Sequence, residues 1–362
     1  MTVARIDQVI PSLASRDAIG GHVMQLRDLL RSRGYRSDIY YGNASVDRLD
    51  DGIPVTRLGD RTSAGRVLLY QLSIGSGVAD IFRQRRERKF VNYHNITPAD
   101  LLEAWMPSVG EEVRRGRAQL RDLAPVTEFA IADSCFNERE LQAAGYRSTT
   151  TVPLLIDLDG FAGTPDRALA ARLADEKADG GADLLFVGKV SPHKGQHDLV
   201  KSLAAYRRLY DGRARLRLVG GAISDAYRSA VERFADELGL GAAVEIAGSV
   251  SHEELIAYYA ASDAFVCLSN HEGFCVPLLE AMYHGLPIVA YTNTAVPETV
   301  QGAGLILPNK EPMRVAAAVD RVVRDEGLRE TLARAASERV AAFSLPRVRD
   351  GFASALEVAY AA

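Results

Sequence analysis

The stretch from Ser269 to Tyr291, SNHEGFCVPLLEAMYHGLPIVAY, constrains the fold more than any other part of the chain. A short apolar run of strand length, Ala264 to Leu268, comes directly before it. The pattern then predicts a helix from about Pro277 to His284, because the glycine and proline that follow would stop it. A second apolar run, Ile288 to Tyr291, restarts as a strand. This order of strand, acidic loop, short helix and strand is typical of a parallel α/β sheet.

Two glutamates mark this stretch as a candidate ligand site. Glu272 lies in the loop and Glu280 in the expected helix. In doubly wound sheets, ligands bind beyond the carboxyl ends of strands, and helix N-termini favour phosphate groups. A nucleoside diphosphate suits this position, with Glu280 accepting hydrogen bonds from a ribose diol and Glu272 from hydroxyl groups of an attached sugar. The alternative is a helix start with incidental acids, because acidic residues favour the helix dipole.

A second loop at a strand end carries two lysines. The apolar run from Leu184 to Val187 predicts a strand, and the sequence GKVSPHKG, residues 188–195, follows it. Lys189 and Lys194 stand five residues apart in this loop. Two cations at a strand end can neutralise a diphosphate, although ordinary surface lysines are the alternative.

The first residues predict one β-α-β unit. We expect a strand from Ile6 to Ile10, a loop that ends in Gly20 and Gly21, a helix from His22 to Arg33, and a second strand that begins with Asp38 to Tyr41. Two glycines before a helix let the backbone approach a phosphate closely. A plain turn is the alternative for this glycine pair.

The segment from residue 66 to residue 94 is predicted less clearly. Arg66 to Phe82 is expected to be helical, although two glycines interrupt it. Arg83 to Lys89, RQRRERK, reads as a solvated helix end, with a patch for anionic lipid as the alternative. Phe90 to His94 is expected to be a strand. His94 then lies where a strand runs into a loop, a position that favours site residues, while a purely structural histidine is the alternative.

Composition sets the outer limits. The 362 residues favour two domains, and an apolar content of 47% can fill two cores. The net charge of −4 argues against a nucleic-acid partner. The three cysteines lack the C-x-x-C spacing of a zinc site. The sequence shows no signal peptide and no apolar run of about 18 residues, so we expect a cytoplasmic protein, with contact at the inner face of the membrane as an open alternative.

The acidic stretch resembles the E-x7-E segment of retaining glycosyltransferases of family 4, which have the GT-B fold. Cys275 and Tyr283 depart from the family pattern, which has small residues there. The lysine loop is similar to the family's G-R-x-x-x-x-K-G signature, with Lys194 matched and Lys189 in place of the usual arginine. The matching residues of the acidic stretch are Glu272, Gly273, Phe274, Pro277, Glu280, Ala281, Met282, Gly285, Pro287 and Val289.

The resemblance implies an α/β, GT-B architecture of two Rossmann-like, doubly wound domains that face a cleft. It implies an acceptor-side domain over residues 1–156, a linker over 157–180 and a nucleotide-sugar domain over 181–343. The last helix, residues 344–362, would cross back to the first domain.

The resemblance also implies the roles of individual residues. The catalytic groups would be His94, Lys189, Lys194 and Glu272. The donor-binding residues would be Gly20, Gly21, Gly188, Val250, Gly273, Phe274, Cys275, Val276, Leu279 and Glu280.

The predicted function is transfer of a hexosyl-type sugar, with retention of configuration, from a nucleotide sugar to a hydroxyl acceptor in glycan, glycolipid or polysaccharide biosynthesis. The acceptor can be a carbohydrate, a lipid-linked molecule or a small molecule. No cofactor and no metal are expected, because cations stand where metal ligands would be needed. The alternatives are a sugar-nucleotide epimerase of the same fold and a non-catalytic donor-binding subunit. The sequence leaves the donor sugar, the nucleotide base and the oligomeric state open.

Overall fold

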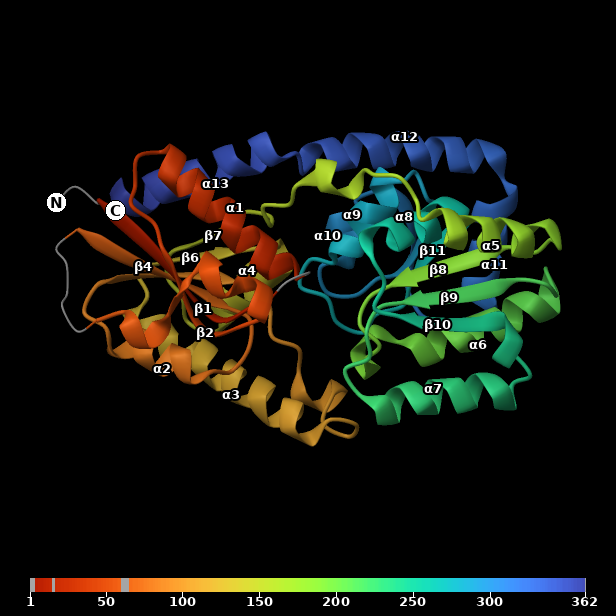
Figure 1. Ribbon diagram of the computed structural model, residues 1–362, viewed down its shortest axis with the longest axis horizontal. Helices are drawn as coiled ribbons and strands as arrows, with labels where there is room; N and C mark the ends of the chain where they lie inside the picture. Colours follow the sequence, from red (N-terminus) through yellow and green to blue (C-terminus); the bar gives the residue numbers. More distant parts are fainter. Residues whose placement is uncertain (1–3, 15–16, 60–64, 362) are drawn as a thin grey trace. The chain divides into compact units, whose positions relative to one another are not determined.

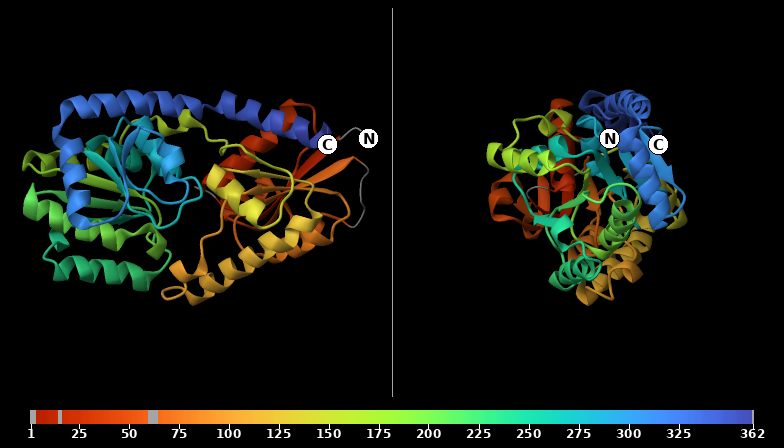
Figure 2. Two further views of the ribbon diagram at one scale, coloured as in Figure 1. Left: turned by 180° about the vertical axis from the view of Figure 1, so that it is seen from behind. Right: turned by 90° about the vertical axis from the view of Figure 1, so that its right-hand side faces the viewer.

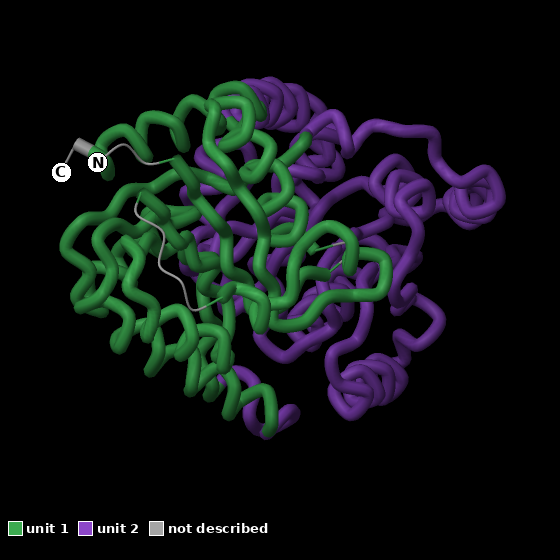
Figure 3. The backbone as a smooth tube through the Cα atoms, turned by 60° about the vertical axis from the view of Figure 1, so that its left-hand side comes forward, with its two compact units in different colours: residues 1–100, 108–157, 343–362 green, residues 101–107, 158–342 purple. Residues whose placement is uncertain are grey.

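The computed structural model describes residues 4–14, 17–59 and 65–361. The chain divides into two compact units, shown in Figure 3. Unit 1 comprises Met1–Asp100, Ser108–Asp157 and Phe343–Ala362, and unit 2 comprises Leu101–Pro107 and Leu158–Ala342. Among the described residues, no helix is both long and apolar enough to cross a membrane.

Unit 1 is built on a parallel sheet, seven-stranded within the described residues, in the order β3-β2-β1-β4-β5-β6-β7. Its strands are β1 (Arg5–Leu13), β2 (Ile39–Ala44), β3 (Ile53–Pro54), β4 (Arg66–Leu72), β5 (Arg88–Tyr93), β6 (Phe129–Ala132) and β7 (Thr149–Thr151). Its helices are α1 (Ala18–Ser32), α2 (Gly77–Gln84), α3 (Pro107–Leu123), α4 (Cys135–Ala143) and α13 (Leu345–Ala361).

The two ends of the described chain share the core of unit 1. Figures 1 and 2 show α13 beside α1, and Arg349 of α13 donates a hydrogen bond to Gln25 of α1 at 2.8 Å. Phe352 is fully buried in the same core cluster as Ile6 of β1 and Phe90 of β5. The last helix therefore completes the hydrophobic core that the first strand begins.

Unit 2 is built on a second parallel sheet, six-stranded within the described part of the chain, in the order β10-β9-β8-β11-β12-β13. Its strands are β8 (Asp183–Val187), β9 (Arg215–Val219), β10 (Val244–Gly248), β11 (Ala264–Cys267), β12 (Ile288–Tyr291) and β13 (Gly304–Leu307). Its helices are α5 (Arg167–Ala178), α6 (Gln196–Leu209), α7 (Asp225–Glu237), α8 (His252–Ala261), α9 (Val276–Tyr283), α10 (Val296–Val300), α11 (Pro312–Arg324) and α12 (Glu326–Ala342).

Both sheets have the strand order of a doubly wound fold. In unit 2 the order reverses between β8 and β11, which pair directly through Ala264 with Leu184 and Phe265 with Leu185. The connections that leave such neighbouring strands diverge to opposite faces, which opens a crevice at their carboxyl ends. The lysine loop follows β8 and the acidic loop follows β11, so both predicted loops lie at this reversal point.

Most predicted elements of unit 2 are confirmed. The strand before the acidic loop, the helix after it and the following strand are β11, α9 and β12. Ser251 caps α8 in a capping box with Glu254, as their spacing indicates.

The helix predicted from Arg66 to Phe82 is wrong. Its first part is strand β4, in which every residue is buried, and only its last part belongs to α2. β4 lies between β1 and β5, so both of its faces are covered and its apolar run has no period. Ser76 caps α2 by accepting a hydrogen bond from the Val78 amide at 3.1 Å.

The predicted loop ending in Gly20 and Gly21 is also wrong, because both glycines lie inside α1. The helix begins at Ala18, four residues earlier than expected. A Cβ atom on Gly20 would lie 2.5 Å from the carbonyl oxygen of Ala14, so a glycine is needed for close packing there. Gly20 therefore serves the packing of α1 against the chain that precedes it.

The basic segment from Arg83 to Lys89 is a solvated helix end only in its first two residues, which are exposed at the end of α2. Its last two residues begin β5, and Lys89 and Glu87 are buried. Arg85 forms an ion pair with Glu87 at 2.6 Å, and Lys89 donates to the carbonyl oxygens of Arg85 and Glu87. These three charged groups are therefore held by neighbouring backbone and side chains, and the lipid patch stays a prediction.

Candidate functional site

The lysine loop and the acidic loop contact each other at the end of the unit 2 sheet. Gly195 has a φ of 71°, and a Cβ atom there would lie 2.5 Å from the carbonyl oxygen of Leu268. Only glycine meets both conditions without strain. The amide of Asn270 donates a hydrogen bond to the carbonyl oxygen of His193 at 2.7 Å, which joins the two loops through their backbones.

This contact brings Lys194 and Glu272 together. The Lys194 Nζ atom lies 2.7 Å from Oε1 and 2.8 Å from Oε2 of Glu272. The Glu272 side chain is 7% exposed and that of Lys194 is 20% exposed. Burial alone would lower the pKa of Lys194, but the charge of Glu272 and its hydrogen bond raise that pKa above its ordinary value. The two predicted residues therefore form one partly buried ion pair.

Neighbouring side chains fix the acidic loop in place. The Glu272 amide donates to Thr294 Oγ1 at 2.9 Å, and Thr299 Oγ1 donates to the carbonyl oxygen of Phe274 at 2.7 Å. Lys310 Nζ donates to Asn270 Oδ1 at 2.6 Å and also forms an ion pair with Asp198 of α6. Sequence analysis missed Thr294 and Lys310, since no local motif marks residues that reach the site from the loops after other strands.

Helix α9 begins directly after the acidic loop. The first turn of α9 contains Pro277. Cys275, the residue directly before the helix, has a left-handed backbone with φ 71° and ψ 70°. The amide groups of this helix start favour a bound anion. Leu279 is fully buried and Phe274 is 6% exposed, so their side chains serve the core.

The other predicted donor-binding residues of unit 2 lie at the same sheet edge or just after it. Lys189 is exposed and follows Gly188, whose φ is 155°. Gly273, Val276 and Val250 are half-buried. Lys189 is thus open to solvent, whereas Lys194 is committed to Glu272.

Glu280 lies on α9 and has a partner that the sequence did not reveal. Tyr259 of α8 donates a hydrogen bond to Glu280 Oε2 at 2.7 Å. Burial raises the pKa of Glu280, and the Tyr259 hydrogen bond opposes this only in part. The Tyr259 ring stacks on His284 with the ring centroids 4.9 Å apart. The carboxyl group of Glu280 is thereby fixed in one orientation.

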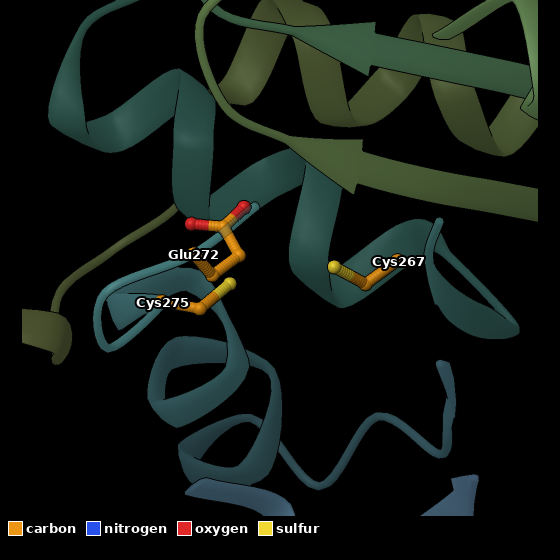
Figure 4. A group of neighbouring side chains, drawn as sticks. All are labelled: Cys267, Glu272 and Cys275. Carbon is orange, nitrogen blue, oxygen red and sulfur yellow. The ribbon is translucent and has the colours of Figure 1, made fainter. Parts of the chain in front are cut away.

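Two cysteines lie beside Glu272, as Figure 4 shows. The sulfur atoms of Cys267 and Cys275 and a carboxylate oxygen of Glu272 all lie within 4.8 Å of one another. Because Lys194 already binds both oxygens of Glu272, the carboxylate in this cluster is occupied by a cation.

His94 belongs to unit 1 and lies in a buried hydrogen-bond network. Its Nδ1 atom lies 2.8 Å from Asp133 Oδ2, and its Nε2 atom lies 2.6 Å from Gln71 Oε1. Gln71 donates through its amide nitrogen to Gln8 Oε1, and Gln8 donates to the carbonyl oxygen of Val23. The carbonyl oxygen of Val23 can only accept, so Gln8 donates to it through its amide nitrogen and accepts from Gln71 through its amide oxygen. Gln71 therefore presents its own amide oxygen to Nε2 of His94, and Nε2 carries the proton of that hydrogen bond. Both ring nitrogens of His94 are therefore engaged within unit 1.

A second histidine, His22, lies next to this network and was missed as a candidate. Its ring centroid is 5.2 Å from that of His94, and its Nε2 atom contacts Asn92 at 2.7 Å. Burial lowers the pKa of His22 well below its ordinary value, and the charge of His94 adds to this. Gly20 and Gly21 precede His22 on α1, so they too belong to unit 1.

Residues 171–339 match the family model described as "Glycosyl transferases group 1". Two curated relatives are a GDP-mannose-dependent alpha-(1-6)-phosphatidylinositol monomannoside mannosyltransferase of Mycobacterium tuberculosis and a D-inositol 3-phosphate glycosyltransferase of Geodermatophilus obscurus. The first is 32% identical over 238 residues, 62% of this chain, and the second 33% identical over 244 residues, 63% of this chain. The matches span 60% and 52% of the relatives' own lengths.

Solved structures resemble nearly the whole chain. Anabaena HepE in complex with UDP and glucose has a TM-score of 0.73 and 17% identity, covering 97% of this chain and 99% of that one. Sucrose-phosphate synthase from Thermosynechococcus elongatus has a TM-score of 0.73 and 19% identity, covering 99% of both chains. The predicted fold class is confirmed: the chain has the GT-B fold with two Rossmann-like units, and its residues 171–339 are similar to the group 1 glycosyltransferases.

Proposed function

We propose that this protein is a retaining glycosyltransferase, similar to family 4, that moves a hexosyl-type sugar from a nucleoside diphosphate donor to a hydroxyl acceptor. The observation that carries the proposal is the Lys194–Glu272 pair, which lies where the strand order of the unit 2 sheet reverses. That position is the usual ligand site of a doubly wound sheet. The match of residues 171–339 to the group 1 model supports the same activity.

The reaction breaks the bond between the anomeric carbon and the diphosphate oxygen. Negative charge grows on the leaving diphosphate, and fixed cations and helix N-termini stabilise such charge. The ammonium group of Lys194 has three N–H donors, of which Glu272 uses two, so one remains for a phosphate oxygen. Lys189, which is exposed, adds a second cation without the bidentate geometry of arginine.

The two glutamates would bind the two ends of the donor. Tyr259 occupies Oε2 of Glu280, and the other oxygen can accept a hydrogen bond from a ribose hydroxyl group. Glu272, held in its orientation by Lys194, would accept from sugar hydroxyl groups. With retention of configuration, the acceptor attacks from the face that the diphosphate leaves, and the leaving diphosphate takes the acceptor proton.

Unit 1 would bind the acceptor. His94 is proposed to assist from this unit, but both of its ring nitrogens are engaged, so a ring contact with the donor requires one of those hydrogen bonds to open. Two relatives are named for acceptors that contain inositol, which makes inositol phosphates and phosphatidylinositol glycolipids the first acceptors to test. An acceptor in a lipid membrane would bring the protein to the inner face of that membrane.

The first experiment is a thermal-shift screen with GDP, UDP, dTDP and ADP and their sugar conjugates. A ligand present at 100 times its Kd stabilises the folded protein by about 2.7 kcal/mol, which is a measurable shift. Donor consumption is then followed with and without acceptor, and sugar transfer is expected only with acceptor. Conversion of the donor alone to a different sugar would favour the epimerase, and binding without any turnover would favour a non-catalytic subunit.

The chelation test addresses the expected metal independence. Because lysines rather than carboxylate clusters would face the diphosphate in the proposed site, activity should persist in excess EDTA. Loss of activity that Mg²⁺ or Mn²⁺ restores would contradict this expectation.

A further inference from the structure

Cys267 and Cys275 form a pair of neighbouring thiols in the acidic loop. Cys267 is the last residue of β11, and Cys275 is the residue before α9. Their sulfur atoms lie within 4.8 Å of each other, and Figure 4 shows both side chains directed toward the space beside Glu272. The neighbouring thiol lowers the pKa of Cys267, and the neighbouring thiol together with burial raises that of Cys275 well above its ordinary value.

A metal ion is not the occupant that this arrangement favours. A divalent cation bound by the two sulfurs and Glu272 would have to replace the Lys194 ammonium at the carboxylate or lie directly beside it. The two sulfurs, by contrast, lie within 4.8 Å of each other and can join directly without a third group.

We propose that Cys267 and Cys275 form a reversible disulfide when a hydroperoxide reaches the acidic loop, and that this disulfide weakens binding of the nucleoside diphosphate. The second part rests on the proposed function of the site, whereas the first part does not.

The oxidation is balanced as follows. One of the two sulfurs, as thiolate, attacks one oxygen of hydrogen peroxide, and the O–O bond breaks to give a sulfenic acid and, after protonation, water. The other sulfur then attacks the sulfenic sulfur, forms the S–S bond and releases a second water. The two thiols are oxidised by two electrons and one peroxide is reduced. A dithiol reductant reverses the reaction by thiol–disulfide exchange.

Formation of the disulfide has to move Cys275. A disulfide bond is about 2.05 Å long, so the sulfurs must approach each other. Cys267 is held in β11, where it pairs with Ala290 of β12. Cys275 has a φ of 71°, a conformation unfavourable for a residue with a side chain, and it starts the helix whose N-terminus faces the predicted diphosphate. Its displacement would disturb both this helix start and Glu272, three residues earlier.

The test uses the full-length reduced protein, hydrogen peroxide and intact mass. Oxidation should lower the mass by about 2 Da, and alkylation should then modify one cysteine in place of three. Digestion after glutamate residues cuts the chain at Glu272, between the two cysteines, so the fragments should stay linked until dithiothreitol is added. Calorimetry with the nucleoside diphosphate found in the screen should show at least about tenfold weaker binding after oxidation, restored on reduction.

Three variants control this experiment. Cys267→Ser should bind the nucleotide like the parent, form no disulfide and keep its affinity in peroxide. Cys275→Gly, which restores the family pattern, should also form no disulfide. Cys135→Ser, which removes the exposed cysteine of unit 1, should still form it.

The outcomes separate the two parts of the proposal. Oxidation of Cys135 alone, or independent sulfinic acids on Cys267 and Cys275, would overturn the disulfide. A disulfide form that binds the nucleotide as well as the reduced form would overturn the effect on binding. If the reduced protein binds no nucleoside diphosphate, the proposed function fails, and the mass result alone still decides whether the disulfide forms.

Discussion

Removal of the Lys194 charge is expected to destabilise unit 2 through Glu272. In Lys194→Met the aliphatic chain stays, but the Glu272 carboxylate, 7% exposed, keeps no cation at 2.7 Å. Breaking a fully buried ion pair by removing one partner costs 3–5 kcal/mol, and the 20% exposure of Lys194 reduces this to about 2–3 kcal/mol. Glu272→Gln alone should cost a similar amount. The loss of unfolding free energy in the double variant should be smaller than the sum of the losses in the two single variants, by at least about 1.5 kcal/mol.

Urea unfolding followed by tryptophan fluorescence measures this coupling. Trp105, the single tryptophan of the sequence, belongs to unit 2, and its ring centroid lies 5.4 Å from that of Tyr227. Its signal therefore reports the loss of its ring contact with Tyr227 of α7. Because the pKa of Lys194 is raised on folding, its contribution is fully present below the ordinary lysine pKa of about 10.4 and is lost as the pH rises through the folded value. Additive costs in this cycle at pH 7 would refute the ion pair.

Three further variants test other parts of the site. Gly195→Ala should weaken nucleotide binding at least about tenfold, because a Cβ atom 2.5 Å from the Leu268 oxygen displaces the lysine loop. Gly239→Ala, with φ 69° but nothing within 4 Å, is the matched control and should only lower stability, by about 1–2 kcal/mol. Glu280→Gln should weaken binding of the free nucleoside diphosphate and of its sugar conjugate by similar factors in calorimetry; an effect on the conjugate alone would show that Glu280 does not bind the ribose. His94→Ala should lower kcat while nucleotide affinity stays the same. It should also lower the melting temperature, because two buried partners each lose a hydrogen bond, at a cost of about 1–3 kcal/mol in the free energy of unfolding. An unchanged kcat would remove His94 from the site.

The sequence predicts unit 2 well because its signals are local. Short apolar runs end in glycine, proline or a capping serine, so each strand and helix is marked by its own neighbours. Ser251 with Glu254 shows this most clearly, since the spacing alone indicates the capping box that is observed. The same kind of signal identified the lysine loop and the acidic loop.

The sequence could not predict which side chains meet across the fold. Lys194 and Glu272 are 78 residues apart, and each was assigned to a different part of the donor. Tyr259 reaches Glu280 from another helix, and no motif contains both residues. In unit 1 the fully buried strand β4 was mistaken for a helix, because an apolar run covered on both faces has no period. Packing between distant segments decides all of these features.

The division of unit 1 between the two ends of the described chain has a consequence for folding during synthesis. The ribosome makes the chain from its N-terminus, and domains generally fold as units while they emerge. All residues of unit 2 precede Phe343, so the chain of unit 2 is made before α13. Ile6 and Phe90, in contrast, lack Phe352 as a core partner until the last helix has been released. Unit 1 is therefore begun before unit 2 and completed after it, and its exposed core is the surface that a nascent-chain chaperone would have to cover.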